Sequence, residues 1–399
     1  GMQIALNPSP FNEKLDAVDM SKISIFLLNE VEGFQLTGEK ETEAIIGKLR
    51  ELFPHARIML TLGKDGAVYV DEKQKVFQPI FKVKAVDTTA AGDTFTGYFV
   101  AGLAEGRSVE ERMERAAQSY RLEIAVEIYK ALQDEYIDFE PLRIPKIEFS
   151  GVDSETDEAA MAKAADEIEQ IANTLREYWK LGDGPIENLQ FVLESNGIIV
   201  TGFPTAADGI DAFSQRTYVS DHDVYAIAVD QGDKPEGRIR FDLAHELGHI
   251  LLHPWSESLD MITKEEFKIR EKQANLFASA FLLPADSFRK DAQAYPTDLK
   301  YYLWLKKKWH VSVAAMLYRA HQLHIITDNQ FSYLMRQYSK NGWRKGEPDD
   351  SPFLLNDNVF QGAIDMLFEE HVLTPVTFMR FLKSRSIDLF PDDVEEILH

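Results

Sequence analysis

Hydrophobic residues gather in short runs in the first 118 residues of the chain. IFLLNEVEG begins with four residues of this kind at 25–28, and IMLTLGKDGAVYV holds two apolar runs broken by LGKDG. Short apolar runs bounded by Gly, Asn or Asp are typical of buried strands. The second sequence therefore predicts two strands joined by a turn.

Beyond residue 118 the pattern is mainly helical. SYRLEIAVEIYKALQDEY predicts an amphipathic helix, and a Pro-containing extended connector follows it. ETDEAAMAKAADEIEQIANTLREYWK predicts a long helix ended by Gly182 and Gly184. LQFVLESNGIIVTGFP then predicts the end of a helix and a strand, and VYAIAVD predicts a strand at the edge of its sheet. A change of composition after GWRKGEPDDSP predicts a boundary near Pro348.

The segment FDLAHELGHILLH carries the most specific chemical signal in the chain. His245, Glu246 and His249 have the spacing HExxH. Four residues are just over one helical turn, so on a helix both imidazoles project from one face and the glutamate lies beside them. The alternative is an ordinary amphipathic helix in which these residues coincide. Asp242 is the expected N-cap, and the apolar face comprises Leu243, Leu247, Ile250 and Leu251.

A catalytic zinc ion needs a third protein ligand besides two histidines and a water molecule. The chain contains no cysteine, which leaves His, Asp or Glu. EEFKIREKQANLFASAFLLP predicts a second helix with one carboxylate, Glu271, on its core-facing stripe, whereas Glu265 and Glu266 lie off it. A carboxylate buried there would need a cation; the alternative is a solvated position at the rim. The stripe consists of Phe267, Glu271, Ala274, Ala278 and Phe281.

These motifs resemble those of the ImmA/IrrE family of zinc metallopeptidases. The similarity rests on AHELGHILLH and on ExxANxFAxxFLLP from Glu271 to Pro284, and it extends to KKKWHVSVAAMLYRAHQLHIIT. It implies an α+β zincin-like peptidase domain at 151–347, preceded by a helical linker and connector at 119–150 and followed by a small helical module at 348–399. It also implies an intracellular protease that cleaves or inactivates a helix-turn-helix transcriptional repressor.

The expected chemistry is that of a zinc metalloendopeptidase of the HExxH...E, or gluzincin, type. His245, His249 and Glu271 would hold one Zn²⁺, which lowers the pKa of a water molecule toward neutrality. Glu246 would take the water proton as general base and return it to the leaving amine. Three nearby residues could stabilise the oxyanion, and the sequence does not choose among them: His253, Tyr225 and His222.

A second chemical signal lies at 86–106, in VDTTAAGDTFTGYFVAGLAEG. A small, Gly-containing turn here precedes an apolar helix, so backbone N–H groups from Ala90 to Asp93 could form an anion site at the helix N-terminus. The alternative is a helix that begins with small residues because it packs closely on a sheet.

NPSP, NEVE, TLGKDG and DTTAAGD together resemble the C-terminal part of the ribokinase-like (PfkB) sugar kinases, over residues 3–118 of a first domain at 1–118. The resemblance implies an incomplete ribokinase-like α/β fold. Asp93 would be the base that activates a sugar hydroxyl, and Asn29 and Glu32 would belong to the magnesium and phosphate network. The other positions assigned to nucleotide, phosphate or sugar are Thr61, Gly63, Gly66, Asp87 and Gly92.

The kinase resemblance begins in the middle of that fold. Its N-terminal half, with the sugar-binding strands and the lid, has no counterpart here, and a phosphate cradle without a sugar pocket cannot position an acceptor. We therefore expect neither sugar kinase activity nor a working ATP/Mg²⁺ site. The chain is interpreted as a fusion protein in which this segment replaces a DNA-binding domain.

Composition limits the partners. The net charge is -23, and residues 1–118 hold 14 basic and 18 acidic groups, so about -19 belongs to the remainder. That part should repel DNA and could attract a basic protein substrate. The absence of a membrane-length apolar run, signal peptide or cysteine predicts a cytoplasmic protein. Three hypotheses remain: a zinc peptidase acting on a regulatory protein, a sugar kinase, and a non-catalytic, zinc-stabilised repressor-binding protein.

Overall fold

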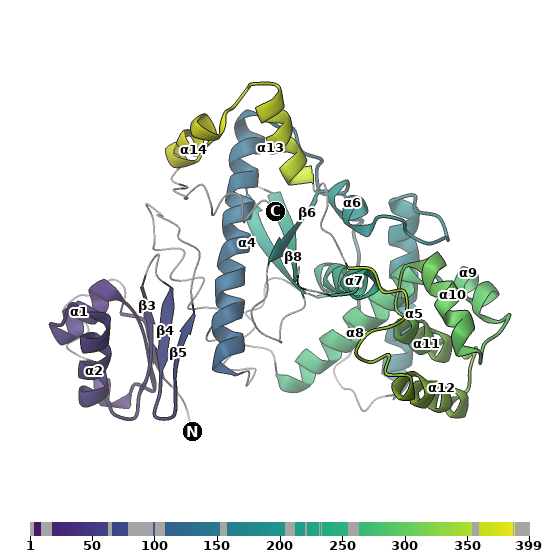
Figure 1. The fold of residues 1–399 in the computed structure, drawn as a ribbon, viewed down its shortest axis with the longest axis horizontal. Helices are drawn as coiled ribbons and strands as arrows, with labels where there is room; N and C mark the ends of the chain where they lie inside the picture. The colour runs from purple at the N-terminus through teal and green to yellow at the C-terminus, as the bar shows by residue number, and fades with distance from the viewer. Residues whose placement is uncertain are drawn as a thin grey trace. The chain divides into compact units, whose positions relative to one another are not determined.

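The computed structural model describes residues 4–8, 18–62, 66–78, 99, 108–151, 158–203, 212–219, 222–230, 232, 234–253, 263–352, 359–385 and 387. The chain divides into two compact units. One comprises residues 1–131 and 367–398, and the other comprises 132–366 with residue 399. Figure 1 shows the fold, with labels on many of the elements of each unit.

The first unit contains a five-stranded sheet in the order β1-β2-β3-β4-β5. The first three strands are parallel, whereas β3 with β4 and β4 with β5 are antiparallel pairs. The two strands predicted on either side of LGKDG are therefore present as β3 and β4. The strands are β1 (Ala5–Leu6), β2 (Ile25–Asn29), β3 (Arg57–Thr61), β4 (Ala67–Val70) and β5 (Lys75–Gln78).

Helices cover both faces of this sheet, because its central strands are apolar on both sides. After the short 3-10 turn η2 (Met20–Lys22), α1 (Glu30–Thr37) and α2 (Thr42–Leu52) connect β2 to β3. Phe26 and Leu28 pack with α2 on one face, and Ile25 and Leu27 belong to the core on the other face. The beginning of α4 (Val109–Glu135) contributes to that second core.

Two short helices, α13 (Val359–Glu369) and α14 (Pro375–Ser384), lie near the C-terminal end of the chain. Thr374 caps α14, because its side chain accepts from the Thr377 N–H. Phe368 and Phe378 pack edge to face with ring centroids 5.7 Å apart. These are helices of the kind predicted for the C-terminal module.

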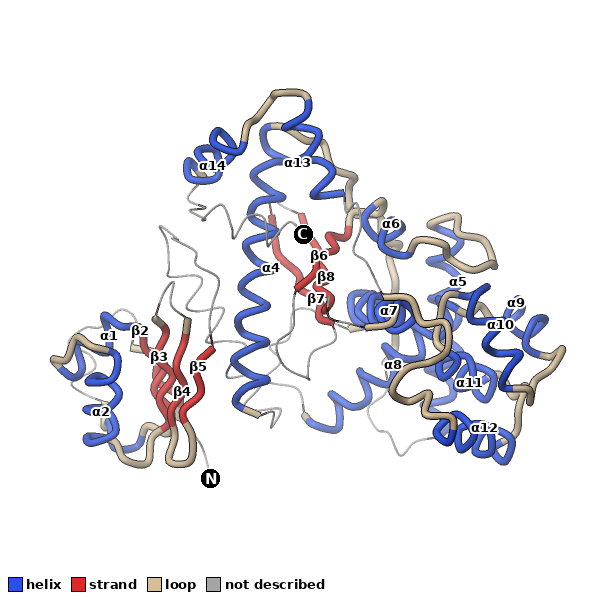
Figure 2. Tube along the Cα trace, in the orientation of Figure 1, coloured by secondary structure: helices blue, strands red, loops and turns tan. Residues whose placement is uncertain are grey.

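The second unit combines a three-stranded sheet with a larger group of helices (Figure 2). Its core includes apolar residues of α5, α7, α8, α10 and α11. The strands are β6 (Ile198–Phe203), β7 (Ala212–Val219) and β8 (His222–Asp230). The helices are α5 (Glu158–Tyr178), α6 (Leu189–Glu194), α7 (Glu236–Leu252), α8 (Lys264–Leu282), α9 (Ala285–Ala292), α10 (Leu299–Trp309), α11 (Val313–Gln322) and α12 (Asp328–Lys340).

The prediction that VYAIAVD forms an edge strand is wrong. The order of the sheet is β6-β8-β7, so β8 is the central strand, parallel to β6 and antiparallel to β7. Residues 224 and 226–229 are buried, as expected for a strand with neighbours on both sides. The edge nearest to the HExxH helix is β7.

The HExxH helix begins earlier than predicted. α7 starts at Glu236 with Pro235 as N-cap, so Asp242 lies within the helix and is not its cap. Proline at this boundary can precede the helix because it needs no N–H partner there. Leu243, Leu247 and Ile250 of the predicted apolar face are buried, and Leu251 is partly buried against the same core.

Buried arginines hold the C-terminal end of α8. Arg176 of α5 donates from Nη1 to the Phe281 carbonyl at 2.6 Å, and Arg319 of α11 donates from Nε to the Leu283 carbonyl at 2.9 Å. These carbonyls lack partners within the helix. No helix in the described part of the chain is long and apolar enough to cross a membrane.

Candidate metal centre

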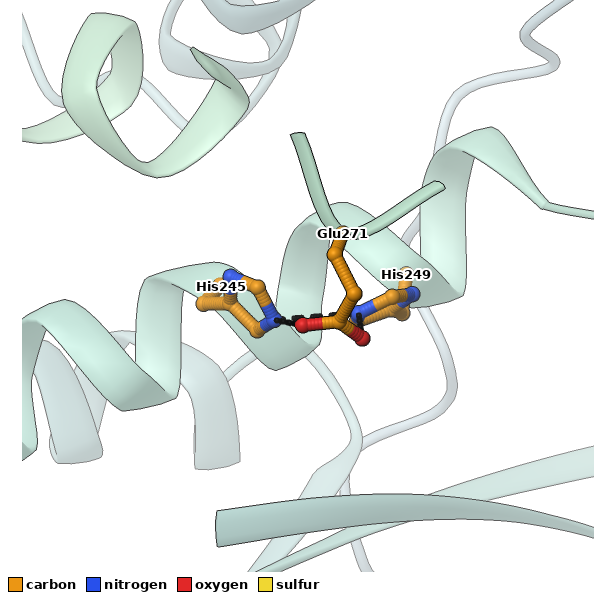
Figure 3. Close-up of side chains that lie close together, drawn as sticks. All are labelled: His245, His249 and Glu271. Carbon is orange, nitrogen blue, oxygen red and sulfur yellow. Dashed lines mark hydrogen bonds and ion pairs between the residues drawn. The ribbon is translucent and has the colours of Figure 1, made fainter. Parts of the chain in front are cut away.

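Three side chains predicted as metal ligands converge between α7 and α8. Nε2 of His245 and Nε2 of His249 are 3.0 Å apart. The Glu271 carboxylate lies 3.4 Å from the first nitrogen through Oε2 and 3.3 Å from the second through Oε1. Figure 3 shows the carboxylate pointing at both rings. The three residues form a group that could hold a metal ion.

The geometry follows from two features of the sequence. The spacing of four residues places both imidazoles on one face of α7, and Gly248 lets α8 approach that helix closely. A Cβ at position 248 would lie 3.2 Å from both Cα and O of Ala274 and 3.1 Å from the Phe277 ring. A side chain at this position would therefore push apart the two helices that carry the ligands.

The three distances fit a tetrahedral zinc ion. Ligand atoms roughly 2.0–2.1 Å from such an ion lie roughly 3.3 Å apart along the edges of the tetrahedron. The two nitrogens are 3.0 Å apart, and each lies close to a different oxygen of Glu271, at 3.4 and 3.3 Å, so each of these pairs is near this spacing. Two nitrogens and a carboxylate oxygen are also the donor set of catalytic zinc sites, which leave one position open.

Hydrogen bonds fix the tautomer of His245. Its Nδ1 lies 3.2 Å from Oδ1 of Asn275, while Nδ2 of the same amide donates to the Glu271 carbonyl at 2.8 Å. That second bond orients the amide so that its oxygen faces the imidazole. Since an amide oxygen can only accept, Nδ1 carries a proton, so Nε2 is the nitrogen that can bind a metal once it gives up the proton it shares with Glu271.

A chain of hydrogen bonds through His253 and Gln273, here called the relay, places a proton on Nδ1 of His249. Its Nδ1 lies 2.9 Å from Nδ1 of His253, whose Nε2 lies 3.0 Å from Oε1 of the buried Gln273. The glutamine oxygen accepts from His253 Nε2, so His253 Nδ1 is an acceptor for the His249 proton. Burial, and then the nearby His249, lower the pKa of His253 to about 3, so His253 is neutral as the relay requires.

The charges around the group favour a cation. Burial alone would raise the pKa of Glu271, but hydrogen bonds from His245 and His249 and the charges of both rings lower that pKa well below its usual range. Burial also tends to lower the pKa of His245. The hydrogen bond to Glu271, with the charges of Glu246, Glu271 and Asp242, outweighs burial and raises that pKa.

Glu246 points to the sheet instead of joining the three ligands. Its side chain is buried, and its Oε2 accepts a 2.6 Å hydrogen bond from Oγ of Ser214 on β7. Ser214 was not predicted from the sequence, because 32 residues separate the two and no motif includes the serine. Asn275 belongs to the ExxAN motif, whereas Gln273 has no comparable signal.

The prediction that Glu271 is a buried carboxylate is only partly correct. Its neighbours on the stripe, Ala274, Ala278 and Phe281, are fully buried, but 39% of the Glu271 side chain is exposed. It therefore lies at the rim, as the alternative interpretation held, and still faces both histidines. Of the candidate oxyanion donors, His253 lies behind His249, Tyr225 is on β8, and the side chain of His222 is outside the described part.

The kinase-like positions are described only in part. Asn29 caps α1: its Oδ1 accepts from the Glu32 N–H and Glu32 Oε2 accepts from the Asn29 N–H, both at 2.9 Å. Thr61 donates from Oγ1 to the Leu28 carbonyl, and Gly66 has a φ of 111°. The remaining predicted positions lie outside the described residues: Gly63, Asp87, Gly92 and Asp93.

Two family models match separate parts of the chain. The pfkB family carbohydrate kinase model matches residues 1–120, and the IrrE N-terminal-like domain model matches residues 194–321. The two-part organisation predicted from the motifs is thus confirmed. The chain joins a kinase-family segment to an IrrE N-terminal-like domain.

The N-terminal part of the chain is similar to several known proteins. A deoxyribokinase of Salmonella typhi is 35% identical over 120 residues, or 29% of this chain and 39% of that protein. A ribokinase of Haemophilus influenzae is 41% identical over 116 residues, which are 28% of this chain and 37% of that protein. The chain thus spans about two fifths of these relatives. The match to a crystal structure of Cryptococcus neoformans ribokinase with ADP covers 30% of this chain and 45% of the ribokinase chain. The sequence identity is 29% and the TM-score is 0.27.

Proposed function

We propose that this protein is a zinc-dependent endopeptidase of the gluzincin type whose substrate is a helix-turn-helix transcriptional repressor. The observation that carries the proposal is the convergence of His245, His249 and Glu271, with separations that suit a tetrahedral zinc ion. The match of residues 194–321 to the IrrE N-terminal-like domain supports a peptidase.

Each residue of the site has a separate role in the proposed hydrolysis. His245, His249 and Glu271 would hold the ion, and bound zinc supplies Lewis-acid activation of water and of the scissile carbonyl. Glu246 takes the proton of the attacking water and delivers it to the leaving amine. Ser214 holds the Glu246 side chain in place through Oε2. The outer hydrogen bonds of Asn275 and His253 keep both imidazoles in the ligating tautomer.

The substrate backbone would bind along β7. This strand is at the edge of its sheet and contacts the HExxH helix, with Ser214 touching the general base. An extended peptide can add to such an edge through main-chain hydrogen bonds. The acidic charge beyond residue 118, about -19, would favour a basic, DNA-binding substrate. The kinase-like segment would serve as a fold unit or docking surface.

Incubation with candidate repressors tests the proposal. Zinc-loaded protein is mixed with a panel of small helix-turn-helix repressors, and mass spectrometry identifies the fragments. We expect one repressor to be cut at a defined bond. Repressor binding without any cleavage would instead support a non-catalytic, zinc-stabilised binding protein.

Substitution of the general base separates metal binding from chemistry. Glu246→Gln should retain one zinc ion per chain by elemental analysis and lower cleavage by about 100-fold or more, because a general base contributes at least this factor. Glu265→Gln, on the exposed first turn of α8, is the matched control and should cleave normally. A Glu246→Gln protein with unchanged activity would refute the assigned role.

A further inference from the structure

A cleft of about 720 Å³ lies beside the candidate metal centre in the second unit. Its walls come from the N-terminal half of α7, the middle of α8, the exposed side of α11 and the segment 343–350. This volume is in the range of pockets that hold small organic molecules. None of the three metal ligands lines it, although Asn275, the hydrogen-bond partner of His245, does.

The irregular wall of the cleft is anchored at several points. The buried Glu347 carboxylate accepts from the backbone N–H groups of Val313 and Ala314 at 2.9 and 3.2 Å and from the Tyr338 hydroxyl at 2.9 Å. It also pairs with Lys306 at 3.0 Å. These contacts fix the segment without a ligand, so the cleft is preformed, as small-molecule sites usually are.

The cleft presents apolar surface to its interior. Phe241, Leu276, Ala315, Tyr318 and Trp343 are among the lining residues. The Trp343 ring packs edge-on against Tyr338, with centroids 5.9 Å apart, so one wall is a supported aromatic surface. Aromatic and aliphatic walls of this kind accommodate a flat apolar group.

Positive charge gathers around the cleft in an otherwise acidic protein. The chain has 43 basic and 66 acidic residues, yet four cationic side chains line this site: Arg238, Lys272, Arg344 and Lys345. Three carboxylates also line it: Glu347 and Asp350 both pair with Lys306, and Asp242 lies within α7, where its charge acts on His245. Within the described residues, neither Lys272 nor Lys345 forms an ion pair. The cleft therefore has cations available for a ligand.

We propose that this cleft binds a small amphipathic organic anion, with an aromatic or apolar body and a carboxylate or phosphate group. The body lies against Phe241, Leu276 and Trp343, and the anionic group reaches Lys272 and Lys345. This binding site is separate from the zinc ligands and does not depend on peptidase activity. Its position beside Asn275 would place the ligand next to the outer hydrogen bonds of the metal centre.

Calorimetric titration of the full chain with three probes tests the proposal. The probes are naphthoate, naphthyl phosphate and the neutral naphthylmethanol. We expect at least one anion to bind with one-to-one stoichiometry. The neutral probe should bind at least about tenfold more weakly than that anion. Comparison of the two anions shows whether carboxylate or phosphate is preferred. Equal binding of all three probes, or no binding, would overturn the proposal.

Variants locate the bound anion. Lys272→Gln combined with Lys345→Gln should weaken anion binding about three- to tenfold and leave the neutral probe unaffected, since each exposed ion pair contributes modestly. Ala315→Trp, which fills the cleft, should abolish binding, with circular dichroism to check folding. The matched control is Lys290→Gln with Lys300→Gln, two exposed lysines outside the cleft. Each titration is repeated after chelator treatment and with added zinc. Binding that requires zinc, or that survives both cleft variants, would place the anion elsewhere and refute the site.

Discussion

At the scale of single residues, the candidate centre depends on hydrogen bonds behind the ligands. Asn275 fixes the proton of His245, and the relay from His249 through His253 to Gln273 fixes the other ring. Each neutral imidazole carries one proton, so assigning it to Nδ1 leaves Nε2 free to bind metal. The residues behind the ligands thus decide whether both nitrogens can bind at once.

Removing the relay should weaken zinc binding without unfolding the protein. His253→Ala and Gln273→Leu are each expected to lower zinc affinity about 10- to 100-fold, because outer partners of ligating histidines contribute this much. Competition with a chromophoric chelator measures the affinity. His55→Ala, an exposed histidine of the first unit, is the control. Unchanged affinity in both relay variants would show that His249 does not need these partners.

The three residues that converge at the candidate centre were predicted from the sequence, but their hydrogen-bond partners were not. His245, His249 and Glu271 could be found because helical spacing relates the histidines to each other and a helical stripe singles out the glutamate. Ser214 and Gln273 act through contacts made only when separate elements pack. No periodicity connects a serine on β7 with a glutamate on α7. The exposure of Glu271 likewise depends on which neighbours cover the rim, which one helix does not determine.

At the scale of elements, the pair α7 and α8 forms the centre, and Gly248 sets their separation. The absent Cβ at this position lets the backbone of Ala274 approach α7, and buried arginines from α5 and α11 fix the far end of α8. The helices were predictable from apolar periodicity. Their contact was not, because a glycine in a helix has several explanations when its neighbours are unknown.

Adding a methyl group at position 248 should disturb both packing and metal binding. Gly248→Ala is expected to cost about 1–3 kcal/mol of unfolding free energy through overpacking and to weaken zinc binding as the helices separate. Urea denaturation and zinc competition measure the two effects. Gly47→Ala in α2 is the matched control: its Cβ would meet nothing within 4 Å, so it should stabilise the protein by about 0.5–1 kcal/mol. Stabilisation by Gly248→Ala would contradict the packing argument.

The sheet shows where a pattern was misread. A continuous apolar strand such as β8 is typical of a central position. It was predicted at the edge because β7, which pairs with its second side, was not predicted as a strand. β7 has a run of polar residues, Ser214 to Thr217, between apolar ends. This mixed pattern gives a weak strand signal. In the kinase-like sheet, by contrast, the strands around LGKDG were predictable from turn residues and apolar runs.

Glu194 at the end of α6 should make stability depend on pH. Burial raises its pKa from 4.5 to about 8, although hydrogen bonds from the Val359 N–H and Gln190 oppose the change. The folded state therefore holds this proton more tightly than the unfolded state does. The resulting stability is complete below pH 4.5 and is lost as pH rises through about 8.

Glu194→Gln tests this dependence. The variant should be more stable than the parent at about pH 9, by an amount on the order of a few kcal/mol, and should differ less at about pH 6. Urea denaturation at both pH values measures the difference. Glu177→Gln, on the exposed face of α5, is the control and should change neither value. Equal stabilities of Glu194→Gln and parent at high pH would show that Glu194 is ionised without cost.

At the scale of the whole molecule, two units with their own cores coexist in one chain. The first is built around a five-stranded sheet, and the second holds the candidate centre with all of its ligands and supports. Domains with separate cores generally unfold as separate cooperative units. The division between kinase-like and peptidase-like parts was predictable because each has its own motifs.

Zinc should stabilise only one of these units. Differential scanning calorimetry is expected to show two transitions, with zinc at about 100 times its Kd raising only one of them, by roughly 5–10 °C. His249→Ala should abolish the shift and leave the other transition unchanged. A single transition that moves as a whole with zinc would show that the units unfold together.

The hydrogen bond from Ser214 makes the two oxygens of Glu246 chemically unequal. Oε2 already accepts the hydrogen bond from the Ser214 hydroxyl, so one of its lone pairs is occupied. In the proposed mechanism the attacking water would therefore face Oε1, and its proton would transfer to that oxygen. In that mechanism the Ser214 hydrogen bond would determine which of the two carboxylate oxygens takes the water proton.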